Sequence, residues 1–205
     1  MKKVIVVISL IVLVFLVSGF SDSEIPSNEK LNIAHEISYV PTKEESILLD
    51  YRIPFVGKGF TGFREAIAFK ESQGKYDVVN SLGYLGKYQF GKSTLKRFKI
   101  YNTQGFLSNP ELQEDAFIAL CSLNKWILRK DIRRTVGKKI NGIEITESGI
   151  LAAAHLAGAG NVKKYLRSRG KVSFKDAFGS SVQFYLKRFS GYDTSFIEAS
   201  KKPVV

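Results

Sequence analysis

Glu71 and the residues that follow it are the part of the sequence whose types and spacing could do chemistry. The glutamate stands at the expected end of a helix and precedes a glycine- and tyrosine-rich stretch, Gly83 to Phe90. Cleavage of a glycosidic bond needs a proton delivered to the leaving oxygen, and a glutamic acid kept protonated by a partly apolar pocket can deliver it. The pattern favours Glu71 as the general acid of a glycan-cleaving site. The alternative is an ordinary solvated acid at a helix end.

The same stretch matches the phosphate-binding pattern GxxxxGK[ST] from Gly86 to Ser93. A phosphate loop follows a buried strand, whereas Asn80 to Leu85 contains two polar residues and a glycine. We therefore do not expect this segment to bind nucleotide.

We interpret the segment as a turn that faces a sugar. Glycines at 83 and 86 allow the backbone to turn tightly. We expect Tyr84, Tyr88 and Gln89 to present polar edges to the substrate.

The elements that must position these residues are predicted to be mainly helical. From Thr61, apolar residues recur at intervals of three and four, and Gly74 stands where a helix cap belongs, so Glu71 falls in the last turn. Asn141-Gly142 predicts a small hairpin over Lys138 to Ile145. Further helices are predicted near Ser93 and after Ser108-Asn109-Pro110-Glu111. Thr146 can cap a helix at Ile150 to Ala157, which Gly158 and Gly160 are expected to break. Two more helices are predicted at Asn161 to Arg169 and at Ser181 to Phe189.

The long helix after Pro110 has one broad apolar face, which we assign to the core. Its members are Leu112, Ala116, Ala119, Leu120, Leu123, Trp126 and Ile127. Cys121 is the only cysteine, so the chain has no internal disulfide, and we expect a buried, inert thiol.

The start of the chain has the pattern of an export signal. Met1-Lys2-Lys3 precedes an apolar run from Val4 to Val17, which is shorter than the roughly 20 residues that span a bilayer. We predict a signal peptide at 1–20, a polar spacer at 21–58 and one domain at 59–198. The protein is then exported to the periplasm or cell envelope. An uncleaved signal that tethers the protein to the membrane is the alternative.

Basic residues outnumber acidic ones by 31 to 19, which gives a formal net charge of +12. Such a balance suits an anionic partner. Export argues against nucleic acid and favours peptidoglycan, whose lactyl and peptide groups carry carboxylates. A solvated basic surface without a partner is the alternative.

Four short motifs together resemble a known family. They are Glu71-Ser72, Gly83-x-x-Gly86-x-x-Gln89, Ala154-His155-Leu156-Ala157-Gly158 and Tyr185. In order and spacing they are similar to the motifs of the soluble lytic transglycosylase and goose-type lysozyme superfamily, over about Phe60 to Tyr192.

The resemblance implies a lysozyme-like helical domain that acts on peptidoglycan glycan strands. Glu71 would be the catalytic acid, and Ser72, Gln89, His155 and Tyr185 would contact or position the substrate. The implied reaction cleaves the bond between N-acetylmuramic acid and N-acetylglucosamine and closes a 1,6-anhydro ring, so it needs neither a second carboxylate nor a cofactor.

The sequence also departs from the family pattern. His155 and Leu156 stand where many relatives have tyrosine and asparagine, and Lys87-Tyr88 replaces two apolar residues. A histidine on an apolar helix is typical of a hydrogen-bonded core residue, and neither histidine has a second ligand at metal-binding spacing. We expect a monomer without a metal.

Two other functions stay open. A hydrolytic lysozyme would need a second acid, for which Asp77, Glu111, Asp115 and Glu147 are candidates. A non-catalytic module that binds peptidoglycan would keep the groove without using Glu71.

Overall fold

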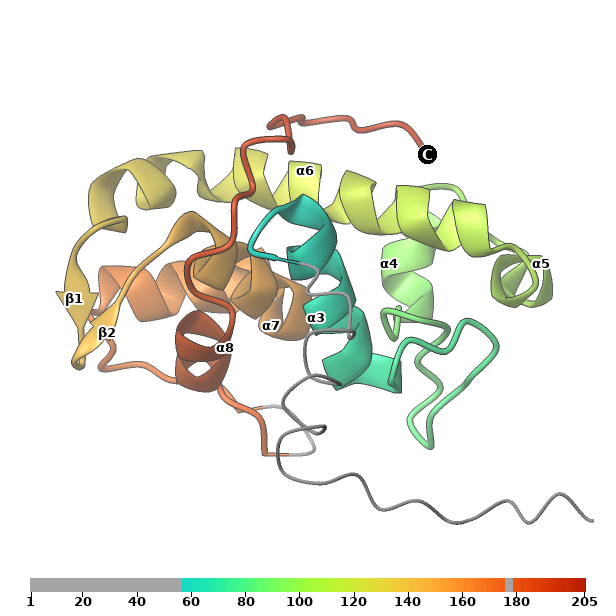
Figure 1. Cartoon of the computed structure of the whole chain (residues 1–205), viewed down its shortest axis with the longest axis horizontal. Coiled ribbons are helices and arrows are strands. Elements are labelled where there is room, and N and C mark those ends of the chain that lie inside the picture. The colour runs from blue at the N-terminus through green and yellow to red at the C-terminus, as the bar shows by residue number, and fades with distance from the viewer. Residues whose placement is uncertain (1–56, 176–178) are drawn as a thin grey trace, which may run out of the picture. The chain divides into compact units, whose positions relative to one another are not determined.

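The computed structural model describes residues 57–175 and 179–205 (Figure 1), all within the unit Pro54–Val205. The predicted signal peptide and all but the end of the predicted spacer lie outside the described residues. The elements, in chain order, are α3 (Phe60–Ser72), α4 (Lys92–Arg97), α5 (Thr103–Leu107), α6 (Pro110–Thr135), β1 (Lys139–Ile140), β2 (Ile143–Glu144), α7 (Glu147–Arg167) and α8 (Val182–Arg188). The predicted mainly helical fold with one small hairpin is confirmed.

Side-chain caps fix where three of the helices begin. The side chains of Asn109, Thr146 and Ser181 accept hydrogen bonds from the first-turn amides of α6, α7 and α8. These bonds satisfy backbone N–H groups that a helix leaves without partners. The short α5, capped by Asn102, was not predicted, because five residues are too few to show a period.

The hairpin follows the predicted turn. Lys139 pairs with Glu144 and Ile140 with Ile143, and the turn residues Asn141 and Gly142 have φ of 51° and 76°. These positive angles are those of a two-residue turn that matches the strand twist.

The α3 and α7 helices end or bend at residues with positive φ. In α3 the left-handed cap is Gln73, one residue before the predicted Gly74, so Glu71 does lie in the last turn. In α7 the backbone leaves the helical region only at Gly158, with φ of 75° and ψ of 148°. The predicted break at Gly160 is wrong, since that residue is helical.

The core lies between α6, α7 and α8, with α3 packed into it. Fully buried aromatic rings fill it, among them Phe63, Phe117 and Tyr165. Cys121 is buried and free, and burial raises the pKa of its thiol. Trp126 was assigned to the core but is only half-buried, and it stacks instead against Arg129.

The segment after α8 returns across α3 and α6 (Figure 1). Phe196 stacks on Phe60 of α3 with ring centroids 4.9 Å apart, and the Ser200 amide donates to the Ser122 carbonyl of α6. Ile197 is 1% exposed, so the segment completes the core. No helix in the described part of the chain is long and apolar enough to span a bilayer.

Gly149 sets how closely α7 approaches α8. A Cβ atom added there would lie 2.6 Å from the Leu186 carbonyl oxygen and 3.2 Å from the Leu186 Cα, both backbone atoms. Only glycine therefore permits this crossing, which places the α8 residue Tyr185.

We predict that Gly149→Ala lowers the free energy of unfolding by about 1–3 kcal/mol, because the backbones of α7 and α8 must separate. Gly160→Ala is the matched control on the same helix, since nothing lies within 4 Å of its added Cβ. It should be neutral or stabilising by up to about 1 kcal/mol. Urea unfolding measures both, and equal stability of the two variants would show that the crossing is not tight.

Candidate active site

The last turn of α3 and the middle of α8 meet at a single hydrogen bond. The Tyr185 hydroxyl donates to the Glu71 Oε1 at 2.7 Å, although 114 residues separate the two positions. The tyrosine is 1% exposed and the glutamate is half-buried. Among the described residues Glu71 Oε2 has no hydrogen-bond partner. One carboxyl oxygen is thus fixed in place, and the other is available for proton transfer.

Ser72 connects this carboxyl group to the neighbouring turn. Its hydroxyl donates to the Lys87 carbonyl at 2.7 Å. The predicted hydroxyl neighbour of the acid therefore anchors the backbone instead of offering its proton to a substrate.

The turn itself is closed by paired backbone bonds. Leu85 and Phe90 exchange two bonds of 2.9 and 2.8 Å, and the Gln89 side-chain amide donates to the Gly86 carbonyl at 2.9 Å. Gly86 and Gln89 both have positive φ. A Cβ at Gly86 would lie 2.1 Å from Gln113 Oε1, so the predicted need for glycine at this position is explained by a close approach as well as by the backbone angle.

Gln113 of α6 forms hydrogen bonds with the turn and was not predicted from the sequence. This fully buried side chain accepts from the Lys87 amide at 2.8 Å and donates to the carbonyls of Tyr76 and Phe106 at 3.0 and 2.9 Å. It thereby satisfies three backbone groups that would otherwise be buried without partners. A glutamine within an amphipathic helix gives no pattern that would single it out.

Lys87 is a buried cation at the centre of a charged network. Its ammonium, 6% exposed, contacts Glu65 and Glu114 at 2.8 Å each and the Tyr76 hydroxyl at 3.1 Å. Burial alone would lower the pKa of Lys87, but the hydrogen bonds that its ammonium donates to Glu114, Glu65 and Tyr76 raise the pKa overall. Burial likewise would raise the pKa of Glu114, but hydrogen bonds from Lys87, Tyr88 and Tyr76 lower it.

The prediction that Tyr88 faces a sugar is wrong. Its ring is fully buried and stacks on Phe117 with centroids 4.1 Å apart, and its hydroxyl donates to the Glu114 Oε2 at 2.6 Å. Tyr88 points inward because Phe117 and Glu114 of α6 pack against this side of the turn.

A groove of about 550 Å³ lies between α4, α6 and α7, beside this turn. Three predicted substrate-binding residues line it: Tyr84, Gln89 and His155. Gln89 Oε1 has no partner within the described part of the protein and can accept a hydrogen bond from a ligand. Glu71 does not line the groove. Its neighbour Ser72 is hydrogen-bonded to Lys87 of the turn, and the turn residues Gln89 and Phe90 line the groove.

His155 and Asn124 contribute polar atoms without protein partners to the same groove. His155 Nε2 is 2.8 Å from the Tyr88 carbonyl oxygen, which supports the turn as expected of a hydrogen-bonded histidine, while its Nδ1 has no partner. Asn124 is 4% exposed and its Nδ2 is also unpaired. Sequence reasoning missed Asn124, whose only signal is an amide within an apolar helical face.

The turn from Gly86 to Ser93 does not form a phosphate cradle. Its amides at Lys87, Gln89 and Phe90 donate to the Gln113 side chain, the Gly86 carbonyl and the Leu85 carbonyl respectively. A phosphate loop needs such amides free to face the ligand.

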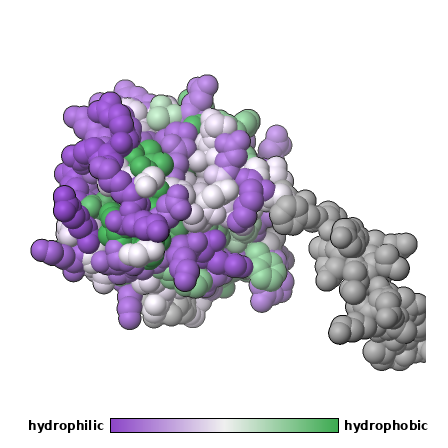
Figure 2. All heavy atoms as spheres, turned by 60° about the vertical axis from the view of Figure 1, so that its left-hand side comes forward, coloured by the Kyte–Doolittle hydropathy of each residue, from purple (hydrophilic) through white to green (hydrophobic). Residues whose placement is uncertain are grey.

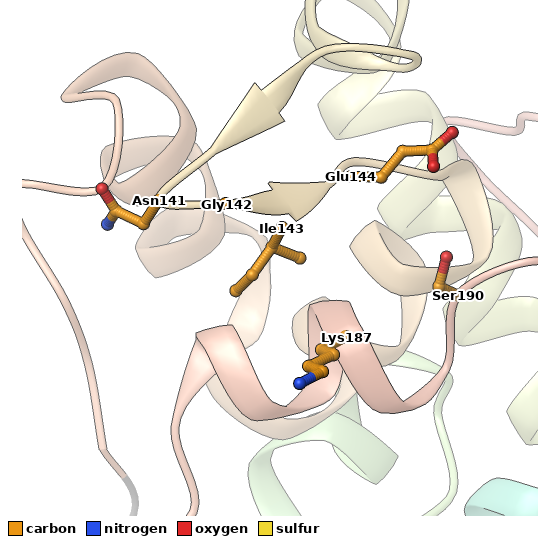
Figure 3. A pocket seen from close by; sticks show the side chains of 6 residues that line it. All are labelled: Asn141, Gly142, Ile143, Glu144, Lys187 and Ser190. Atoms are coloured by element: carbon orange, nitrogen blue, oxygen red, sulfur yellow. The ribbon is translucent and has the colours of Figure 1, made fainter.

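A smaller cavity of about 350 Å³ lies between the hairpin and α8 (Figure 3). Ile143 points from β2 toward α8, while Glu144 and Asn141 point away in opposite directions. The side chains do not converge on a common point, so we do not assign a ligand to this cavity.

No group of three or more His, Cys, Asp or Glu residues within 57–175 and 179–205 could hold a metal ion.

Comparisons of the chain with protein-family models, curated proteins and solved structures found no match. Function must therefore be argued from the motifs and the geometry of the site.

The charged network predicts how stability depends on pH. Because the pKa of Glu114 is lower in the folded protein, its stabilisation is present above the usual pKa of 4.5 and is lost as the pH falls through the folded value. We expect Glu114→Gln to be less stable than the wild type at pH 7, with a difference that shrinks below about pH 4.5. Glu198→Gln, an exposed control, should follow the wild type. A Glu114→Gln deficit that is independent of pH would contradict the network.

Proposed function

We propose that this protein is a peptidoglycan lytic transglycosylase. It would cleave the β-1,4 bond between N-acetylmuramic acid and N-acetylglucosamine. The observation that supports this most is the hydrogen bond of Tyr185 to Glu71, which joins the first and last of the four motifs at 2.7 Å. The groove that residues of the second and third motifs line offers the hydrogen-bonding groups that a glycan needs.

The proposed reaction uses Glu71 twice. The Oε2 proton passes to the bridging oxygen as the bond from that oxygen to muramoyl C1 breaks. The carboxylate then accepts the proton of the muramoyl C6 hydroxyl, and O6 forms the new bond to C1. No water is consumed, and Glu71 ends in its starting protonation state. Tyr185 holds Oε1, so that Oε2 faces the substrate in both steps.

Hydrolysis would need a second carboxylate. Of the four candidates, Glu147 is engaged by Lys125 at 2.7 Å and by the Thr194 hydroxyl at 2.8 Å, which makes it the weakest candidate for activating water. We further propose that the protein acts in the cell envelope on an anionic peptidoglycan partner, consistent with its predicted export and basic charge.

Glu71→Gln should fold normally and lose peptidoglycan cleavage, because the amide keeps the shape of the side chain but cannot transfer the proton. General acid–base catalysis contributes about 10²- to 10⁴-fold, so the rate should fall at least that far. Tyr185→Phe and Gln89→Ala should cost less, since the proton donor remains. Glu144→Gln, an exposed carboxylate on the hairpin, is the control and should keep full activity. Near-normal turnover by Glu71→Gln would exclude it as the acid.

The product should be an anhydromuropeptide, lighter by one water than the hydrolytic product. Mass analysis of digested, purified peptidoglycan measures this directly. Muropeptides with a reducing end would instead identify a hydrolase. Binding of peptidoglycan without any cleavage by the wild type would identify a non-catalytic module.

A further inference from the structure

A third cavity lies at the other end of the helices that form the groove. It measures about 620 Å³ and is bordered by the C-terminal ends of α6 and α7 and by the hairpin. We call it the basic pocket. It is lined by Asp131, Arg134, Thr135, Lys138, Lys139, Ile140, Asn141, Leu166, Arg167 and Arg169.

Five cations and one carboxylate face this cavity, so its lining is strongly positive. Ile140 and Leu166 are both nearly buried and provide an apolar floor. Figure 2 shows this end of the molecule, where hydrophilic residues gather around small hydrophobic patches. The five cations thus surround a hollow.

The one carboxylate already has its partners and orders two of the cations. Asp131 is 1% exposed and accepts from Arg134 and from Arg167, the latter through Nε at 3.0 Å and a terminal nitrogen at 3.4 Å. Burial would raise the pKa of Asp131, but these bonds from the two arginines lower it, so it stays ionised. Both arginine side chains remain more than half exposed. Each guanidinium has five N–H donors, so donors remain for a ligand.

Helix dipoles explain only part of this charge. Arginines in the last turns of α6 and α7 stabilise those helices, which accounts for Arg134 and Arg167. Lys138, Lys139 and Arg169 lie beyond the last residues of α6 and α7, so they are not part of the last helical turns.

The walls of the basic pocket are fixed to one another. Asn141 Nδ2 donates to the Gly170 carbonyl at 3.3 Å, and a Cβ at Gly170 would lie 2.2 Å from that same nitrogen. Glycine at 170 therefore lets the hairpin approach the turn after α7. The backbone that carries these cations is therefore fixed before any ligand arrives, and Asp131 orders Arg134 and Arg167, which lowers the entropy cost of binding.

We propose that the basic pocket binds a phosphate group. Guanidinium forks and lysine ammonium groups are the side chains that recognise phosphate, and a multiply charged oxyanion matches an excess of four cations better than a single carboxylate. A hollow of about 620 Å³ has room for a compact phosphate or diphosphate group. This proposal does not depend on glycan cleavage by Glu71.

The test uses pyrophosphate as the probe and the full chain in isothermal titration calorimetry. The pocket variant is Lys138→Gln/Lys139→Gln/Arg169→Gln, which leaves the Asp131 ion pairs intact. The control variant is Arg133→Gln/Lys163→Gln/Lys164→Gln, which removes the same charge from the same helix ends outside the cavity. We expect saturable binding that the pocket variant weakens at least about tenfold and the control variant less than about twofold. Absence of saturable binding, or equal loss in both variants, would overturn the proposal.

Two further binding experiments identify the chemical class and the source of the ligand. Citrate at equal ionic strength should bind clearly more weakly than pyrophosphate, and equal affinity would overturn the assignment to phosphate. Vesicles with and without phosphatidylglycerol distinguish the sources. Sedimentation with phosphatidylglycerol vesicles that depends on the pocket residues would assign the phosphate to a lipid headgroup. Pyrophosphate binding without vesicle binding would assign it to a soluble molecule.

Discussion

The burial of the Lys87 ammonium constrains the whole candidate site. A buried charge is tolerated only when oppositely charged groups and hydrogen bonds surround it. Glu65 from α3 and Glu114 from α6 must therefore approach the turn from two sides. Once they do, the backbone next to Lys87 is brought against Gln113, and its carbonyl reaches Ser72. The turn and the last turn of α3 thus become one rigid unit, which includes the position of Glu71.

The Glu71–Tyr185 pair depends on a second, independent constraint. Tyr185 reaches Glu71 only because α8 lies close against the start of α7 at Gly149. The buried network therefore positions the acid, and helix packing positions its partner. These two supports share no hydrogen bond, so damage to one should leave the other in place.

Local signals predicted the elements well because each depends on nearby residues. The caps at Thr146 and Ser181 and the Asn141-Gly142 turn are decided within four residues, so the sequence is enough. Glu71 and Tyr185 were assigned to one site only through the resemblance of the four motifs. Nothing in either residue alone predicts a contact across 114 positions.

The sequence does not show which side of a turn or helix will be buried, and this is where its predictions failed. Tyr88 and Gln89 are adjacent and both suit a sugar site, yet the first is in the core and the second lines the groove. Asn124 and Gln113 were missed for a similar reason: an amide on a helix has the same sequence pattern whether it faces water, core or ligand. Only the three-dimensional packing of α6 against the turn decides which of these surroundings each amide has.

The segment that follows α8 has a consequence for how the chain acquires its structure. Its residues Phe196, Ile197 and Ser200 complete the packing of α3 and α6, which are synthesised long before them. Contacts this distant along the chain form slowly, because the intervening loop must close first. Until this segment has been synthesised, α3 and α6 therefore lack their last packing contacts, and the domain cannot finish its core.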